Sequence, residues 1–155
     1  MSTGTYYKDI ITYYERLGEQ QGPLFAIECA ERAVFWAQVS GVPIDTHSLE
    51  AIAASKKYIN KIIGNTALHA ARVLAYEAWI DDDDIDDKDL VVIKGESTKR
   101  SARFMVARIA YGTTFEVSQQ TYRYAIENCA ELIGEEEMAW QIRRARLLSE
   151  ATAII

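Results

Sequence analysis

The residues in this sequence best suited to chemistry are seven aspartates within nine positions, namely Asp81, Asp82, Asp83, Asp84, Asp86, Asp87 and Asp89. Carboxylates packed this densely repel one another, so they must be solvated or neutralised by a metal ion or a basic protein surface. Outside residues 81–89 the chain has 16 acidic and 16 basic residues. The whole formal net charge of −6 therefore resides in this one segment.

The aspartates do not fit the usual calcium loop. Asp82, Asp84 and Asp86 fill its first, third and fifth positions, but Asp87 stands where the loop needs glycine and Ile93 where it needs a bidentate glutamate. The DDxxD magnesium pattern of helical prenyl-chain enzymes also occurs, but seven aspartates in nine residues produce it by abundance alone. No metal site is predicted from this run.

Carboxylates elsewhere leave one enzymatic alternative open. Small all-helical nucleotide pyrophosphohydrolases hold Mg²⁺ with a Glu-x-x-Glu pair on one helix and a Glu-x-x-Asp pair on the next. Glu28 and Glu31 have the first spacing, whereas Glu77 and Asp81 lie four residues apart instead of three. A magnesium-dependent hydrolase is thus the minority interpretation.

Other reactive residues are few. His47 and His69 are 22 positions apart, and we expect His69 to be packed within a helix. Cys29 and Cys129 have no cysteine or histidine at ligand spacing, which predicts two buried free thiols. The sequence contains no complete catalytic constellation, so we expect a noncatalytic protein without a cofactor.

The elements that must position these residues are helices. Apolar residues recur at three- and four-residue spacing, and glycine, proline or capping residues separate the repeats. The predicted helices are one that ends near Gly18, then 23–41, 46–64, 66–79, 97–112, 116–133 and 135–150. Residues 90–93 are predicted to be an extended segment on the bundle. We expect one all-α domain over residues 1–155, a compact bundle of six or seven helices with an acidic loop at 81–96.

Charge and hydropathy exclude several partners. The global charge is negative and no aromatic residues are interleaved with the basic cluster Arg143-Arg144-Arg146, so nucleic-acid binding is not expected. No apolar stretch approaches the roughly 20 residues of a membrane span, and the N-terminus has no signal-peptide pattern, so a cytoplasmic protein is expected.

Local spacing predicts ion pairs from Glu28 to Arg32 and from Arg146 to Glu150. Three glutamates at 135–137 fit the positive end of a helix dipole.

Three segments resemble the Imm-five-like family of immunity proteins. They are Leu24-Phe25-Ala26-Ile27-Glu28-Cys29-Ala30-Glu31-Arg32-Ala33-Val34, then His69-Ala70-Ala71-Arg72, and then Ala139-Trp140-Gln141-Ile142-Arg143-Arg144. The positions that match the family motif are Glu28, Cys29, Ala30, Glu31, Ala70, Ala71, Arg72, Trp140 and Gln141. The resemblance covers most of residues 24–146. The tyrosine-rich first helix lies outside it, and residues 81–96 look like an insertion.

The resemblance implies a protein that binds and neutralises a cognate toxin without catalysis. On this interpretation the aspartates Asp81–Asp89 steer a basic face of the partner, and Tyr76, Trp79 or Tyr111 anchor it. An acidic viral anti-defence protein would use the same physics against a different target. A homodimer is compatible with the sequence.

Overall fold

The computed structural model describes residues 3–83, 102–115 and 119–154. Within these ranges the chain forms six α-helices and no strands, which confirms the all-α prediction. The helices are α1 (Thr3–Val39), α2 (Thr46–Ile59), α3 (Asn65–Asp83), α4 (Ala102–Thr113), α5 (Gln119–Ile133) and α6 (Glu135–Ile154). The predicted extended segment at 90–93 lies outside the described residues.

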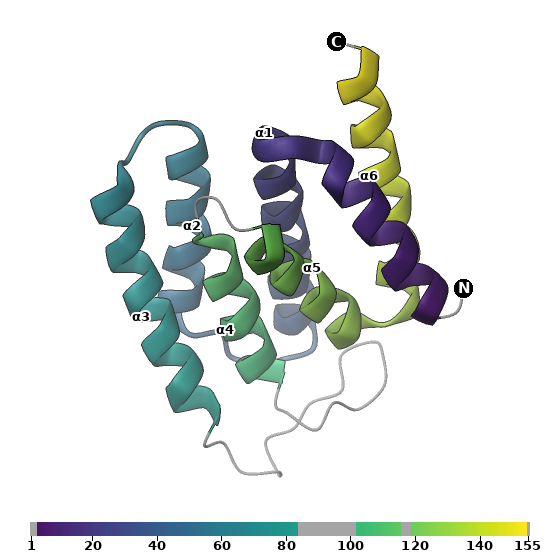
Figure 1. The fold of residues 1–155 in the computed structure, drawn as a ribbon. Helices are drawn as coiled ribbons and strands as arrows, with labels where there is room; N and C mark the ends of the chain where they lie inside the picture. Colours follow the sequence, from purple (N-terminus) through teal and green to yellow (C-terminus); the bar gives the residue numbers. More distant parts are fainter. Residues whose placement is uncertain (1–2, 84–101, 116–118, 155) are drawn as a thin grey trace.

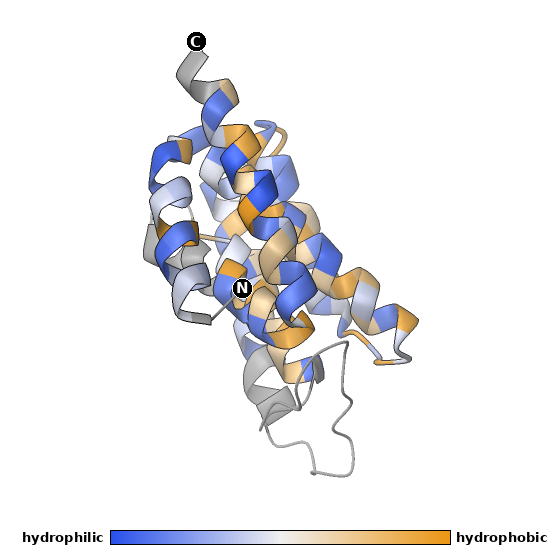
Figure 2. Cartoon of the chain, turned by 90° about the vertical axis from the view of Figure 1, so that its right-hand side faces the viewer, coloured by the Kyte–Doolittle hydropathy of each residue, from blue (hydrophilic) through white to orange (hydrophobic). Residues whose placement is uncertain are grey.

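The helices pack around α1 and α4. Helix α1 contacts α2, α4, α5 and α6, whereas α3 packs only against α2 and α4 (Figure 1). Hydrophobic and hydrophilic residues alternate around the helices, as an amphipathic bundle requires (Figure 2). Alanines such as Ala26, Ala30 and Ala33 are fully buried on α1, and these small side chains let neighbouring helices approach closely.

Helix α1 is bent at Gly18. The sequence predicts a helix end there, and Gly18 does leave the helical conformation, with φ 73° and ψ −171°. The backbone is helical on both sides of Gly18, so α1 consists of two helices separated by a kink, in line with the predicted helix end. Pro23 lies inside the second part and has no amide hydrogen to donate to the helix. The parts before and after the bend run in different directions (Figure 1).

Several helix ends differ from the predicted boundaries, as those of α2 and α3 illustrate. Helix α2 ends at Ile59, not near Gly64, because the chain turns there: the Asn60 amide donates to the Lys56 carbonyl at 3.1 Å and the Lys61 amide donates to the Tyr58 carbonyl at 3.0 Å. Lys61 then adopts a left-handed conformation with φ 60°. Helix α3 continues beyond Trp79 to Asp83. The unfavourable dipole energy of a few aspartates, about 0.3–1 kcal/mol each, is therefore not enough to end it at Trp79.

Candidate functional site

The most polar part of the interior is a fork-shaped ion pair between α1 and α6. The Arg32 Nε and Nη2 atoms donate to Glu137 at 2.9 and 2.7 Å on one carboxylate oxygen, and Nε lies 3.0 Å from the other. The Glu137 side chain is fully buried and that of Arg32 is 33% exposed. Glu137 also lies in the first turn of α6, as the dipole interpretation expects, but its main partner is this guanidinium.

Aromatic rings complete the surroundings of Arg32. Its guanidinium carbon lies 4.0 Å from the centre of the Trp140 ring, and Trp140 stacks on Phe25 at 6.3 Å. The hydrogen bonds to Glu137 raise the pKa of Arg32, which keeps the guanidinium charged. The pair is therefore a structural clamp between the two helices.

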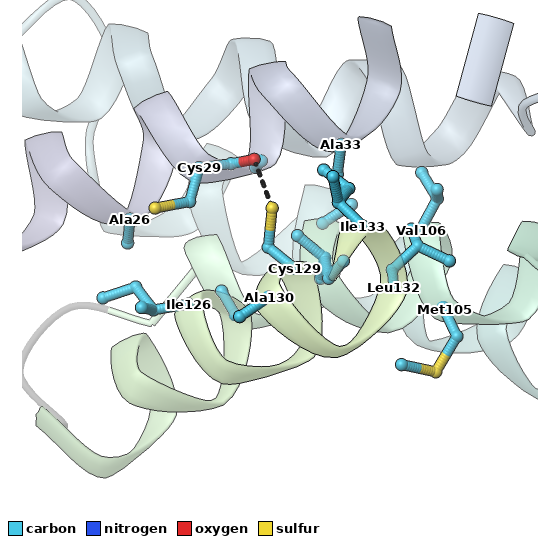
Figure 3. Close-up of a cluster of buried hydrophobic side chains, with 14 of the residues drawn as sticks. Ala26, Cys29, Ala33, Met105, Val106, Ile126, Cys129, Ala130, Leu132 and Ile133 are labelled. Carbon is cyan, nitrogen blue, oxygen red and sulfur yellow. Dashed lines mark hydrogen bonds between the residues drawn. The ribbon is translucent and has the colours of Figure 1, made fainter. Parts of the chain in front are cut away.

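The two cysteines lie beside this clamp. Both are free and fully buried, as predicted. The Cys129 thiol on α5 donates to the Cys29 carbonyl on α1 at 3.0 Å (Figure 3). It also lies 3.6 Å from a Glu137 oxygen. Burial raises the pKa of both thiols, and the neighbouring Glu137 carboxylate raises it further. These thiols are poor nucleophiles and act as packed, weakly hydrogen-bonding groups.

A second buried polar contact joins the ends of the chain. Gln141 is fully buried on α6, accepts a hydrogen bond from the Tyr6 hydroxyl, and donates to the Ile126 carbonyl at 3.0 Å. Burial raises the pKa of Tyr6 well above its ordinary value, so the hydroxyl stays protonated and remains a donor. The oxygen of the Gln141 amide thus links α6 to α1, and its nitrogen links α6 to α5.

We predict that Tyr6→Phe lowers the free energy of unfolding by about 1–3 kcal/mol. The substitution keeps the ring but leaves the buried Gln141 oxygen without its donor. Urea unfolding followed by circular dichroism measures the loss. Tyr13→Phe, at a half-buried position of the same helix, is the matched control and should change the free energy by less than about 0.5 kcal/mol. A loss for Tyr6→Phe no larger than that of the control would contradict the assigned contact.

The carboxylates of the hydrolase alternative point to different partners. Glu28 pairs with Arg144 of α6 through bonds of 2.7 and 2.8 Å, while Glu31 pairs with Lys56 of α2 at 3.2 Å. Glu77 is exposed on α3, which does not contact α1. Among the described side chains, no group of three or more His, Cys, Asp or Glu residues could hold a metal ion.

Local spacing predicted one ion pair correctly and one incorrectly. Arg146 and Glu150 pair at 3.1 Å on the surface of α6, as expected. Glu28 and Arg32 do not pair with each other, because each meets a closer partner on α6. His69 is exposed and not packed as predicted, since the inner face of α3 carries Leu68 instead.

The residues that match the immunity-protein motif lie in two separate places. Five of them gather where α1 meets α6 and α5: Glu28, Cys29, Ala30, Trp140 and Gln141. Glu31 faces α2 through Lys56. Ala70, Ala71 and Arg72 belong to α3, which contacts neither α1 nor α6. Most of the first group is buried, so these positions maintain the fold and offer little binding surface.

The predicted partner-binding residues are only partly described. Asp81, Asp82 and Asp83 form the last residues of α3, but their side chains and that of Trp79 lie outside the described part of the structure. Asp84, Asp86, Asp87 and Asp89 fall in 84–101, which is not described at all. Tyr76 is described, and its side chain is 45% exposed.

An aromatic cluster continues from Tyr76 across α3 and α4. The rings of Tyr76 and Tyr111 lie 5.7 Å apart, and those of Tyr111 and Phe115 lie 5.0 Å apart. Arg72 covers the Phe115 ring at 4.4 Å and donates to the Thr114 carbonyl at 2.7 Å. The sequence pointed to Tyr76 and Tyr111 but gave no sign that Phe115 and Arg72 extend the cluster. We call these four residues the α3–α4 cluster.

A second apolar surface was not foreseen. A groove of about 320 Å³ lies between α1 and α2, with Phe35 and Leu49 on its walls at 57% and 39% exposure. The sequence carried a signal for it, because Phe35 falls outside the buried stripe of alanines on α1. The Glu31–Lys56 ion pair also lies along this groove.

Comparisons with known proteins add no assignment. No family model, curated protein or solved structure matches this chain. In the part of the chain that the structure describes, no helix has both the length and the apolar character needed to cross a membrane.

Proposed function

We propose that this protein is a noncatalytic, cytoplasmic inhibitor of the immunity type, which binds a basic face of a protein toxin. The acidic end of α3 steers the partner, and the α3–α4 cluster anchors it. One observation carries the proposal. The half-exposed Tyr76 ring lies on the same helix as Asp81–Asp83, and position 83 is seven residues, or roughly 10 Å, beyond it.

The chemistry of the two parts is complementary. Closely spaced carboxylates accelerate encounter with a basic surface, and their effect weakens with salt. Tyrosines provide large contact areas with a polar tip and are frequent binding hot spots. Tyr76 packs against Tyr111, which itself packs against Phe115, so part of the cost of ordering the Tyr76 ring is met before a partner binds. An acidic viral anti-defence protein would use the same binding surface against a different target protein.

The carboxylates of α1 support a binding role over a catalytic one. Glu28 and Glu31 are each neutralised by a basic side chain from a different helix. The partly buried Glu28–Arg144 pair joins α1 to α6, whereas the Glu31–Lys56 pair is exposed and contributes little to stability.

Affinity capture from the native cell lysate, with mass spectrometry, tests the proposal. The wild-type protein should retain a basic protein that a variant with all seven aspartates of 81–89 changed to asparagine loses. The purified partner is then used for stopped-flow association. We expect D82N/D83N/D84N to slow association about tenfold at low salt and to reduce its salt dependence.

The matched control removes the same charge elsewhere. E15Q/E19Q/E50Q neutralises three exposed carboxylates on α1 and α2 and should change the association rate less than twofold. Tyr76→Ala should leave association nearly unchanged and accelerate dissociation, because anchors act mainly after encounter. Equal effects of the two triple variants would mean that total charge, and not the end of α3, directs binding.

A further inference from the structure

The N-terminal part of α1, residues 3–17, docks on the bundle through one apolar stripe. Tyr6, Ile10, Tyr14 and Leu17 recur at three- and four-residue spacing and are each at most 3% exposed. The stripe is secured by the hydrogen bond from Tyr6 to Gln141 of α6. We call residues 3–17 the arm and the rest of the chain the body. In Figure 1 the arm runs beside α6, away from the remainder of α1.

A single residue sets the direction of the arm. Gly18 has φ 73° and ψ −171°, a combination that is essentially restricted to glycine. A Cβ atom built on Gly18 would meet nothing within 4 Å, so no neighbour requires glycine here. The requirement for glycine is therefore purely one of backbone conformation.

The bend also creates a contact that a straight helix could not make. A Cβ atom on Gly22 would lie 3.4 Å from the Tyr14 ring, although positions 14 and 22 would be about 12 Å apart along a straight helix axis. Close to the bend, the arm therefore packs against the residues that follow Gly18. Its buried stripe packs against the body, and Gly18 sets the direction that brings it there.

We infer that the arm is exchangeable between two copies of this chain, and that Gly18 decides which copy it covers. A dimer that exchanges arms keeps every contact between arm and body, and only the hinge conformation differs from the monomer. If residue 18 were helical, α1 would continue through it for about 55 Å with a kink only at Pro23, which carries the arm away from its own body. The surface left uncovered fits the arm of a second copy. This inference is independent of the proposed toxin binding.

Gly18→Ala tests the inference, because alanine disfavours the bent conformation and favours a continuous helix. We expect size-exclusion chromatography with light scattering to give twice the chain mass of 17.5 kDa. Circular dichroism should show at least the wild-type helix content. Hydrogen exchange should show the arm as protected as in the wild type, because it is docked on a partner.

Two controls make the result specific. Gly4→Ala is the same substitution in the same helix, also with open space around its Cβ but without a positive φ, and it should stay monomeric. Insertion of three glycines after position 18 of G18A restores a flexible hinge and should restore the monomer. A monomeric G18A, a G18A dimer with an unprotected arm, or a loss of folding that the insertion does not repair would each overturn the inference.

Discussion

Replacing Arg32 with alanine lowers the free energy of unfolding by about 3–5 kcal/mol, the largest loss expected from one side chain in this fold. The variant leaves the fully buried Glu137 carboxylate without its guanidinium, and the Cys129 thiol at 3.6 Å is too weak a donor to replace it. It also removes the cation that lies over Trp140. Urea unfolding at pH 7 measures the change.

Two companion variants separate charge from packing. Arg146→Ala removes an arginine from an exposed pair, in which both side chains are at least 60% exposed, and should leave the free energy of unfolding almost unchanged. The double variant R32A/E137Q has no buried charge left unpaired and should be more stable than R32A. If the double variant were no more stable than R32A, lost packing and not the unpaired carboxylate would explain the effect.

Alkaline pH should destabilise the protein strongly. Burial raises the pKa of Cys29, Cys129 and Tyr6 above their ordinary values of 9.0, 9.0 and 10.0. Above those values the unfolded chain releases protons that the folded chain retains, so stability falls as the pH rises. Below about pH 8 these groups are protonated in both states and contribute no pH dependence. Each group contributes a slope of about 1.4 kcal/mol per pH unit once it titrates in the unfolded chain.

Denaturant unfolding between pH 7 and 10.5 tests this expectation. The two thiols together should lower the free energy of unfolding by roughly 3 kcal/mol per pH unit above pH 9, and Tyr6 adds to the slope above pH 10. The variant C29A/C129A has the same surface titration and lacks the thiol contribution, so its slope should be shallower by that amount. Parallel pH profiles for the wild type and C29A/C129A would contradict the prediction, because they would show that the thiols have the same pKa in the folded and unfolded chains.

Periodicity in the sequence predicted the helices well, because apolar spacing is a local property. The stripe that contains Tyr14 and Leu17, and the stop at Gly18, could be identified without coordinates. The partner of Arg32 could not. Local spacing selects Glu28, four residues away, whereas the fold supplies Glu137, which is 105 residues away and buried. Long-range pairing depends on how helices are arranged, and periodicity carries no information on that.

For the candidate binding surface, too, the residues could be predicted from the sequence but their contacts could not. Tyr76 and the aspartates stand out by type and density, so they could be predicted from the sequence. Phe115 and Arg72 join them only because α3 and α4 are neighbours in space, since Arg72 and the Thr114 carbonyl that it binds are 42 positions apart. The motif that resembles immunity proteins likewise divides in space, since Ala70 lies on a helix that does not touch α1.

The contact between Tyr6 and Gln141 has a consequence for synthesis of the chain on the ribosome. The two residues are 135 positions apart, so the first helix to be made waits for nearly the last before its tyrosine can be buried. Until Gln141 has been synthesised, the growing chain exposes the apolar stripe of Tyr6, Ile10 and Tyr14. Transiently exposed apolar surface of this kind promotes aggregation and is what chaperones bind. A chain that stops before Gln141 therefore exposes the same residues that are buried in the folded protein.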